Sequence, residues 1–328
     1  MLSAPWVFSN IFTEQTHGKF KLRICRGYHG QECMTPVALT IAGSDPSGGA
    51  GIQADLKTFH QYGVYGTSVL TLLTVQNTCR VSAVRHLDAS FVLAQLDAVL
   101  EDIPPHAAKT GALGTIEVIE AIADRASTFL FPLVVDPVMI SKHGAPMIDE
   151  DARSTLTRKL LPHAFLVTPN IQEAMALAGM EVNSGSSPWS LQKSAIEDAG
   201  KAIADLGVRN VLVTGGHWGG ELTDDATDLL YTEGRFEMFS SKRIATMHTH
   251  GTGCTYSAAI TAELAKGTDL LDAVFTAKRY ISHAIETNPS LGHGQGPVNH
   301  LAPIRGLEAN GGTVPVQLRA QGGTGTGD

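Results

Sequence analysis

The 328-residue sequence has few cysteines, no long hydrophobic run and no basic segment, and each absence excludes a class of protein. Its four cysteines show no paired Cys-x-x-Cys spacing, which argues against a disulfide framework and a zinc finger. No stretch approaches the roughly 20 consecutive apolar residues that a membrane helix needs. The formal charge is 24 minus 32, or −8, so we expect no nucleic-acid partner. Together these features predict a soluble cytoplasmic protein with no membrane partner.

Two common phosphate-binding motifs are also missing. The sequence contains no Gly-x-x-x-x-Gly-Lys-Ser/Thr P-loop, and no Gly-x-Gly-x-x-Gly fingerprint follows the first predicted strand. A different phosphate site is indicated at His250-Gly251-Thr252-Gly253-Cys254-Thr255, which leads into an apolar helical stretch. Its two glycines allow left-handed backbone angles that point N–H groups into one concavity, and the helix adds its dipole. At the helix N-terminus, Cys254 is expected to have a lowered thiol pKa and to act as a base.

Short β-branched runs alternate with helical stretches along most of the chain, which is typical of βαβ units around a mostly parallel sheet. Strands are predicted at residues 37–42, 68–75, 107–110, 133–136, 165–168, 211–214 and 228–231, with a hairpin continuing to 236–240. Helices are predicted at residues 52–62, 90–101, 116–125, 151–161, 171–178, 191–205, 255–266 and 269–286.

This pattern predicts one three-layer α/β/α sandwich over residues 34–301. Residues 1–33 are expected to be a disordered or non-native extension, since a transit peptide fits that stretch only weakly. Residues 302–328 are expected to be a disordered Gly-rich tail, because they lack a periodic apolar face.

Polar residues follow the predicted strands at their carboxyl ends, where open parallel sheets bind ligands. They include another glycine-rich loop at residues 42–57, about two hundred residues before the loop at residues 250–255. The other segments at strand ends are 76–77, 111, 136–137, 169–170 and 215–217. We therefore expect one site at this edge of the sheet, in which a small substrate meets a nucleotide.

These segments together resemble the hydroxymethylpyrimidine phosphate kinases of thiamin biosynthesis, within the ribokinase-like superfamily. The resemblance spans about residues 34 to 300 and is carried by residues 38–57, 75–78, 109–111, 135–139, 168–174, 215–217 and 250–255. It implies a ribokinase-like fold and transfer of the ATP γ-phosphoryl group to the hydroxymethyl group of 4-amino-5-hydroxymethyl-2-methylpyrimidine, and then to its monophosphate. It also implies Mg²⁺ as a cofactor and a homodimer.

The resemblance also implies site residues of four kinds. They are catalytic Cys254, Gly251, Thr252 and Gly253; substrate-binding Gly43, Asp55, Thr74, Gln76, Ala112 and Val138; nucleotide-binding Lys109, Asn170, Thr214, Gly216 and His217; and metal-binding Asp136 and Glu173. The chemistry suits these roles, because the amide of Gln76 offers a donor and an acceptor in one plane and a carboxylate accepts from an exocyclic amine. Carboxylate oxygens are ligands that Mg²⁺ prefers. For Asn170, an N-cap on the following helix is compatible with a nucleotide role.

Two positions depart from the pattern of the family. Thr214 stands where a lysine commonly precedes Gly-Gly-His, and Ala112 stands where a methionine commonly follows Lys-x-Gly. The first change removes a cation near the transferring phosphates, and the second reshapes the substrate pocket. Two alternatives therefore stay open. One is a pyridoxal kinase or a bifunctional enzyme of vitamin B6 salvage, and the other is a non-catalytic pyrimidine-binding module, which an ATP-consumption assay would distinguish from an enzyme.

Overall fold

The computed structural model describes residues 34–139, 147–180, 189–215 and 225–304, together with three short strands outside these ranges. Two of the short strands, β1 (Glu14–Thr16) and β2 (Lys19–Lys21), pair antiparallel within a unit that spans Met1–Thr35. These two strands lie within the predicted 1–33 extension, and their backbone groups pair with one another. The remaining residues of the 1–33 extension lie outside the described residues.

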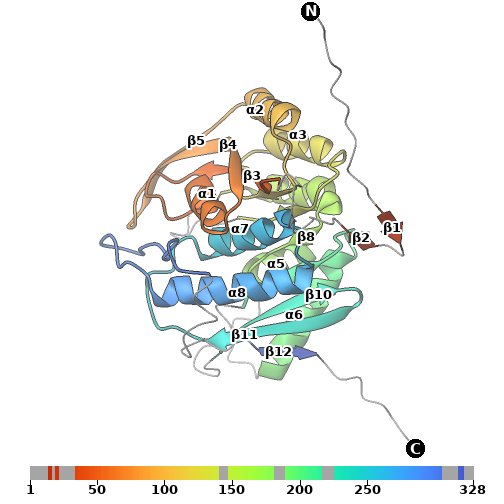
Figure 1. Ribbon diagram of the computed structural model, residues 1–328, viewed down its shortest axis with the longest axis vertical. Coiled ribbons are helices and arrows are strands. Elements are labelled where there is room, and N and C mark those ends of the chain that lie inside the picture. The colour runs from red at the N-terminus through yellow and green to blue at the C-terminus, as the bar shows by residue number, and fades with distance from the viewer. Residues whose placement is uncertain are drawn as a thin grey trace, which may run out of the picture. The chain divides into compact units, whose positions relative to one another are not determined.

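The second unit, Pro36–Asp328, is built on one large sheet (Figure 1). Its strand order is β12-β11-β10-β9-β8-β7-β6-β3-β4-β5. Neighbouring strands run parallel from β9 to β4, whereas both outer parts of the sheet are antiparallel. The strands are β3 (Val37–Ser44), β4 (Tyr65–Gln76), β5 (Val81–His86), β6 (Ala107–Thr110), β7 (Leu133–Val135), β8 (Leu166–Val167), β9 (Val211–Val213), β10 (Asp225–Thr232), β11 (Arg235–Lys242) and β12 (Gln317–Ala320).

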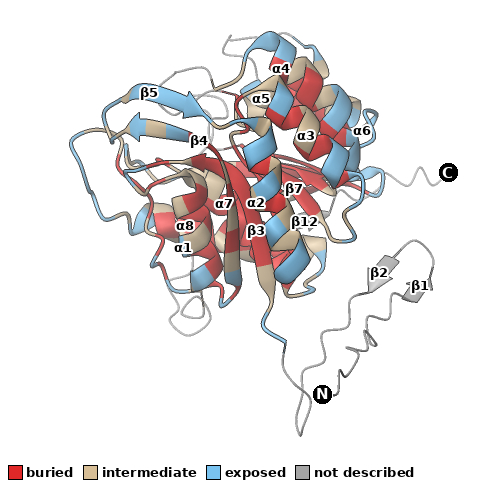
Figure 2. Cartoon of the chain, turned by 90° about the horizontal axis from the view of Figure 1, so that it is seen from above, coloured by how far each residue is buried: buried red, intermediate tan, exposed pale blue. Residues whose placement is uncertain are grey.

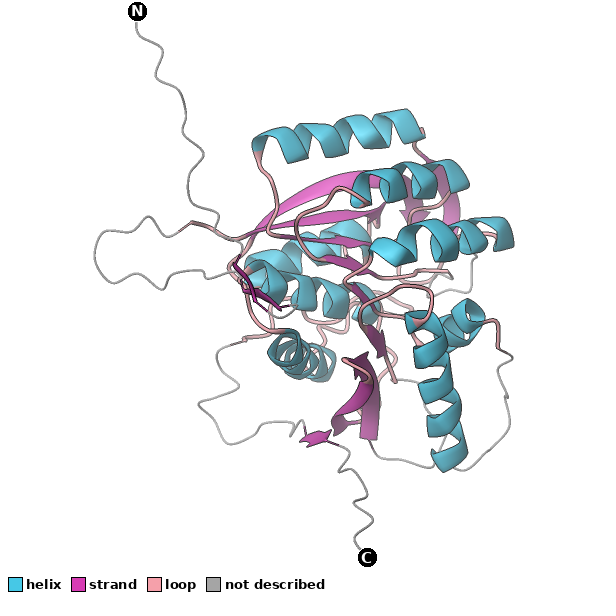
Figure 3. Cartoon of the chain, turned by 90° about the vertical axis from the view of Figure 1, so that its right-hand side faces the viewer, coloured by secondary structure: helices cyan, strands magenta, loops and turns pink. Residues whose placement is uncertain are grey.

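Helices cover both faces of this sheet, which confirms the three-layer α/β/α architecture (Figures 2 and 3). One face carries α1 (Gly51–Gln61), α7 (Thr252–Ala265) and α8 (Leu270–Glu286). The other face carries α2 (Ala89–Asp102), α3 (Ile116–Ala126), α4 (Glu150–Thr155), α5 (Ile171–Ala178) and α6 (Trp189–Ala204). In the described part of the chain, no helix combines the length and the apolar character needed to cross a membrane.

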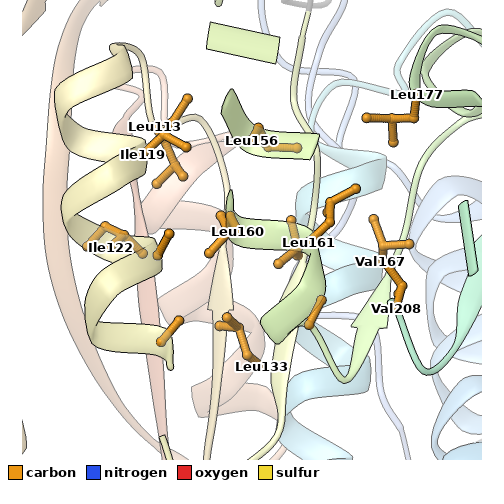
Figure 4. Packing of buried hydrophobic residues seen from close by; sticks show 14 of the residues in the cluster. Leu113, Ile119, Ile122, Leu133, Leu156, Leu160, Leu161, Val167, Leu177 and Val208 are labelled. Atoms are coloured by element: carbon orange, nitrogen blue, oxygen red, sulfur yellow. The ribbon is translucent and has the colours of Figure 1, made fainter. Parts of the chain in front are cut away.

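Two hydrophobic clusters fill the spaces between the sheet and its helices. Because successive side chains of a strand point to opposite faces, Leu39 and Ile41 of β3 join one cluster and Ala38 joins the other. Figure 4 shows the first cluster, where Ile119 and Ile122 of α3 lie near Leu113 and the leucines that follow α4. A buried sheet with a core on each side holds the strand ends, and the loops that leave them, in place.

The predicted elements differ from the observed ones in three places. The predicted helix 151–161 is α4 followed by a π-helical turn (Leu156–Leu160) and a 3₁₀ turn (Leu161–His163), where Pro162 removes a backbone donor. Strand β5 was not predicted, because most of its residues are exposed and it lacks an apolar face. The boundary at residue 301 is also too early, since Ala302 is buried and accepts a hydrogen bond from Gln61, and β12 pairs with the open edge of β11.

Candidate functional site

The first turn of α7 forms the predicted phosphate loop, although only one of its glycines uses the left-handed region. Gly251 is the N-cap with φ +79°, and a Cβ there would overlap the Gly49 carbonyl oxygen. Gly253 is helical and has no positive φ, so that part of the prediction is wrong. Because the first N–H groups of a helix have no intrahelical acceptor, the amides of Gly253 and Cys254 are available to an anion.

A second helix begins at the same place. Gly51, with φ +58°, is the first residue of α1, and its backbone N–H is close enough to the thiol of Cys254 to lower the thiol pKa. The positive ends of two helix dipoles, those of α1 and α7, therefore meet at Cys254. The sequence separates these helices by about two hundred residues, so only their packing against each other brings the two ends together.

The pKa of the Cys254 thiol shifts in the direction opposite to the one that its position at a helix N-terminus predicts. Burial raises its pKa to about 12, and the carboxylates of Asp136 and Asp55 add to the rise. The nearby ammonium of Lys109 and the Gly51 N–H lower the pKa, but they do not compensate for desolvation. Although the residue keeps partial surface exposure, Cys254 is a neutral thiol at pH 7. The predicted thiolate base is therefore corrected.

Lys109 lies beneath the phosphate loop and has no exposed surface. Its ammonium is 2.8 Å from Asp55 Oδ1, 3.9 Å from Asp136 Oδ2 and 3.4 Å from the carbonyl oxygen of Cys254. The other oxygen of Asp55 accepts a 2.6 Å hydrogen bond from Thr40. Desolvation would lower the pKa of Lys109, but the surrounding carboxylates outweigh it and raise the pKa.

This pairing changes the interpretation of both residues. The Asp55 carboxylate is fully buried and both of its oxygens already accept hydrogen bonds. Because the carboxylate has no exposed surface, the structure favours a supporting role for Asp55 over the predicted direct contact with a pyrimidine. Instead, Asp55 holds Lys109 against the first turn of α7, where its charge supports the phosphate loop from below.

Two carboxyl groups lie near the loop, Asp136 directly after β7 and Glu173 in the first turn of α5. Asp136 Oδ2 accepts from the Ser257 hydroxyl at 3.1 Å and lies close to Gly253, whose added Cβ would be 3.9 Å away. Burial and the Asp136 charge raise the pKa of Glu173 to about 8. Burial also raises the pKa of Asp136, against the effect of Lys109. Two mutually repelling carboxyls beside an anion hole are an arrangement that a divalent cation would stabilise.

Asn170 and Glu173 form a capping box at the start of α5. The Asn170 side chain accepts from the Glu173 backbone N–H at 3.0 Å, and Glu173 Oε2 accepts from the Asn170 N–H at 2.9 Å. Thr214 lies beside them, and its N–H donates to the Pro169 carbonyl at 2.9 Å. Asn170 and Thr214, two of the five predicted nucleotide residues, are thus at one end of the sheet. Gly216 and His217, which were assigned to the same site, lie outside the described residues.

The opposite wall of the site comes from β4. The Thr74 hydroxyl donates to the Ser44 carbonyl at 3.0 Å and lies 3.3 Å from the amide of Gln76. Gln76 in turn lies 3.2 Å from the imidazole of His250 in the phosphate loop. The structure therefore brings the predicted pyrimidine residue Gln76 next to the predicted catalytic segment, with α1 on one side.

Three other predicted substrate residues have structural explanations of their own. A Cβ at Gly43 would lie 2.5 Å from Leu72 Cδ1, so packing between β3 and β4 already requires glycine there. The Ala112 carbonyl accepts a 2.6 Å hydrogen bond from Thr71, and the Val138 N–H donates to the Asp136 carbonyl at 2.9 Å. Val138 and Ala112 are both partly exposed, so they can still border a ligand.

Sequence alone assigned no role to Asp45 and His250, which the structure places at the centre of the site. His250 Nε2 is 2.8 Å from Asp45 Oδ2, and both side chains are almost fully buried. The sequence does contain a signal for both residues, since Asp45 lies in the glycine-rich loop at residues 42–57 and His250 begins the one at residues 250–255. The sequence does not show that these two residues, about two hundred positions apart, are in contact.

The sequence and the fold are similar to those of known proteins. The family model described as phosphomethylpyrimidine kinase matches residues 45–299. The chain is 47% identical over 269 residues to hydroxymethylpyrimidine/phosphomethylpyrimidine kinase of Haemophilus influenzae, covering 81% of this chain and 97% of that protein. It is 48% identical over 264 residues to the thiamine biosynthesis bifunctional protein ThiED of Geobacter sulfurreducens, covering 80% of this chain and 52% of that protein. Among solved structures, pyridoxal kinase from Staphylococcus aureus in complex with AMP-PCP and pyridoxal matches with a TM-score of 0.76 and 33% identity, over 88% of this chain and all of that one.

Proposed function

The chain belongs to the phosphomethylpyrimidine kinase family, and on that premise we propose that it transfers the γ-phosphoryl group of ATP to 4-amino-5-hydroxymethyl-2-methylpyrimidine and then to its monophosphate. The product is the diphosphate used in thiamine biosynthesis. The single observation that carries the proposal is the meeting of the α1 and α7 N-termini at Cys254, with Lys109 beneath them. Phosphoryl transfer depends mainly on positioning and on stabilising negative charge, and this geometry supplies both.

The roles of the loop residues follow from their backbone groups. We assign the amides of Gly253 and Cys254 to the transferring phosphoryl oxygens, with Gly251 setting their direction and Thr252 completing the turn. The Thr252 hydroxyl donates to the Thr249 carbonyl at 2.8 Å, which steadies that turn. These donors are pre-oriented, so little reorganisation accompanies the reaction.

Cys254 has a role that suits a neutral thiol. The thiol lies near the Gly51 N–H at the start of α1, and Gln76 of β4 contacts His250 of the same loop. We assign the thiol to orienting the hydroxymethyl oxygen for attack rather than to removing its proton before attack. A loose phosphoryl-transfer transition state requires little prior deprotonation of the attacking hydroxyl.

We assign Mg²⁺ to Asp136 and Glu173, directly or through water. The fit rests on the buried carboxyl of Asp136 and the largely buried carboxyl of Glu173, whose pKa values are raised by desolvation, with the charge of Asp136 adding to the rise at Glu173. When bound, the ion would supply charge neutralisation for the polyphosphate. The protein's own contribution is to orient the carboxyls, through Ser257 at Asp136 and the capping box at Glu173. We assign Asn170 and Thr214 to the side of the site that binds the nucleotide. We assign the reaction to the cytoplasm.

A coupled assay tests this function directly. We would measure kcat/KM for hydroxymethylpyrimidine, its monophosphate and pyridoxal with ATP, and identify the products by mass spectrometry. Formation of the pyrimidine diphosphate, with higher kcat/KM for the pyrimidines than for pyridoxal, is the expected result. No phosphorylation of either pyrimidine would contradict the proposal, and binding without ATP consumption would favour a binding module.

Pyridoxal phosphorylation is the second candidate. It is favoured by the match to a pyridoxal kinase structure and by Ala112, whose small side chain leaves room in the pocket. The same assay decides between one activity and both, because pyridoxal and hydroxymethylpyrimidine share a ring of similar size and a hydroxymethyl group.

We also propose a homodimer. The β4–β5 hairpin exposes Leu73, Val75 and Val84, which is unusual for apolar side chains on neighbouring strands. Light scattering coupled to size exclusion would measure the molar mass of the wild-type protein and of Val75→Lys. A dimer that dissociates in the variant is the expected result, and a wild-type monomer would contradict it.

A further inference from the structure

Three segments of the chain meet at Gln76, His250 and Asp45. Gln76 ends β4, His250 precedes the N-cap of α7, and Asp45 follows β3. The His250 Nε2 atom is 2.8 Å from Asp45 Oδ2 and 3.2 Å from the nitrogen end of the Gln76 amide. One ring nitrogen therefore serves two neighbours, and its hydrogen determines how both are arranged.

The surroundings of Asp45 require that its carboxylate accepts from His250. Oδ1 receives the Ser47 N–H at 2.9 Å and the Ser47 hydroxyl at 2.7 Å. Oδ2 receives the N–H groups of Gly49 at 3.2 Å and Ala50 at 2.9 Å. Four donors already point at this carboxylate, so a proton on either oxygen would have no acceptor. Accordingly the pKa of Asp45 is lowered to about 2, because these hydrogen bonds and His250 outweigh desolvation.

His250 consequently carries its hydrogen on Nε2, and this holds for the neutral ring and for the imidazolium alike. An amide NH₂ cannot donate to a nitrogen that already bears a hydrogen. The group of Gln76 that fits at this point is its carbonyl oxygen, which can share the Nε2–H with Asp45. The oxygen and nitrogen of a glutamine amide occupy nearly the same positions, so the hydrogen-bond network decides between them.

The other end of the amide leads to the same conclusion. The Thr74 hydroxyl donates its single hydrogen to the Ser44 carbonyl at 3.0 Å, which is the shorter of its two contacts. The Thr74 oxygen is then an acceptor toward Gln76, and an NH₂ group suits it whereas a carbonyl does not. Both neighbours of Gln76 thus favour one orientation.

We propose that Asp45 and His250 are positioning residues that hold the Gln76 amide with its carbonyl toward His250 and its NH₂ toward Thr74. They thereby set the order of donor and acceptor that the amide offers to a heteroaromatic ring. The inference rests on the proposed function, because it concerns how that site selects an aminopyrimidine. A ring with the complementary order of acceptor and donor is recognised, and a ring without it loses the contact.

The first test compares selectivity, defined as kcat/KM for hydroxymethylpyrimidine divided by kcat/KM for pyridoxal. His250→Leu removes the donor and should lower this ratio about tenfold, the size of one hydrogen bond between neutral groups, mainly by raising KM for the pyrimidine. His250→Gln keeps an N–H near the same place and should restore most of the ratio. His248→Gln, in the same loop but without contact to Gln76 in the described contacts, is the matched control. Equal losses for both substrates in His250→Leu, or no rescue by His250→Gln, would overturn the proposal.

The second test is a measurement on the wild-type protein, and it uses a variant only to assign one signal. Nitrogen-15 NMR of labelled histidine in the wild-type protein reports which ring nitrogen carries hydrogen, and His250→Gln identifies the signal by its disappearance. A protonated Nε2 up to pH 8 is expected, and an unprotonated Nε2 would overturn the proposal. Absence of pyrimidine turnover by the wild-type protein would instead contradict the proposed function, and the NMR result is independent of that outcome.

Discussion

Lys109 on β6 and Asp55 on α1 form a fully buried ion pair with an Nζ–Oδ1 distance of 2.8 Å, directly beneath the first turn of α7. The pair connects α1 to the phosphate loop, because the Lys109 ammonium also lies 3.4 Å from the Cys254 carbonyl oxygen. A buried charge whose partner is removed is costly, whereas replacing both partners by apolar groups costs much less.

We therefore expect Lys109→Met to lower the free energy of unfolding by about 3–5 kcal/mol. The double variant Lys109→Met/Asp55→Leu should recover a large part of that loss and remain inactive, since the support of the phosphate loop is still missing. Urea denaturation followed by tryptophan fluorescence measures the first effect, and the kinase assay measures the second. Full activity in a well-folded double variant would show that the pair serves folding alone.

Gly251 is expected to tolerate no side chain. Gly251→Ala places a Cβ on the Gly49 carbonyl oxygen and also strains a residue with φ +79°, so it should reduce kcat/KM by at least about a hundredfold, as expected when several phosphate donors are displaced together. The matched control is Gly179→Ala, where φ is +66° and a Cβ would meet nothing within 4 Å. This variant should cost stability of about 1 kcal/mol and leave kinetics unchanged. Similar kinetics in both variants would contradict the steric argument.

Cys254→Ala should lower kcat by at least about tenfold while pyrimidine binding, measured by calorimetry, stays nearly the same. Because burial raises the thiol pKa to about 12, we also expect slow alkylation of Cys254 by iodoacetamide between pH 7 and about 9, compared with the exposed Cys79. Peptide mass spectrometry after timed labelling gives both rates. Rapid modification of Cys254 at pH 7 would indicate a thiolate and restore the base that its helix position predicts.

Glu173 should make the protein less stable as the pH rises. Its pKa is about 8 in the folded state and 4.5 in the reference state, so the unfolded chain releases its proton first and the free energy of unfolding falls between these values. Its side chain keeps partial exposure, which reduces the effect, so Glu173→Gln should gain on the order of 2 kcal/mol at pH 8 without metal and nothing at pH 4.

Thermal unfolding of both proteins at these two pH values, with and without Mg²⁺, provides the measurement. Added Mg²⁺ should raise the Tm of the wild-type protein more than that of the variant, since a metal bound to the native state stabilises it. Glu120→Gln, which changes an exposed carboxylate on α3, is the control. An unchanged response to Mg²⁺ in Glu173→Gln would remove Glu173 from the metal site.

Patterns local in the sequence predicted the sheet and most of its helices. Residues 107–110 and 171–178 were predicted with the bounds that β6 and α5 have, because each has a clear apolar run or a capping residue. Strand β5 was missed, since an exposed antiparallel edge strand gives no such signal. The orientation of Asp55 could not be predicted either, because a carboxylate in the first turns of a helix that follows a glycine-rich loop suits a ligand as well as it suits a buried lysine.

By itself, the sequence determined the layered α/β/α architecture, the family and the segments that gather at the carboxyl ends of the parallel strands, all of which depend on periodicity and short motifs. Only the tertiary structure decided that Cys254 is a neutral thiol, that Lys109 pairs with Asp55, and that His250 joins Asp45 to Gln76. The physical reason is that desolvation and electrostatic interactions depend on which groups become neighbours in space. Here those neighbours come from segments between 54 and 205 residues apart in the sequence.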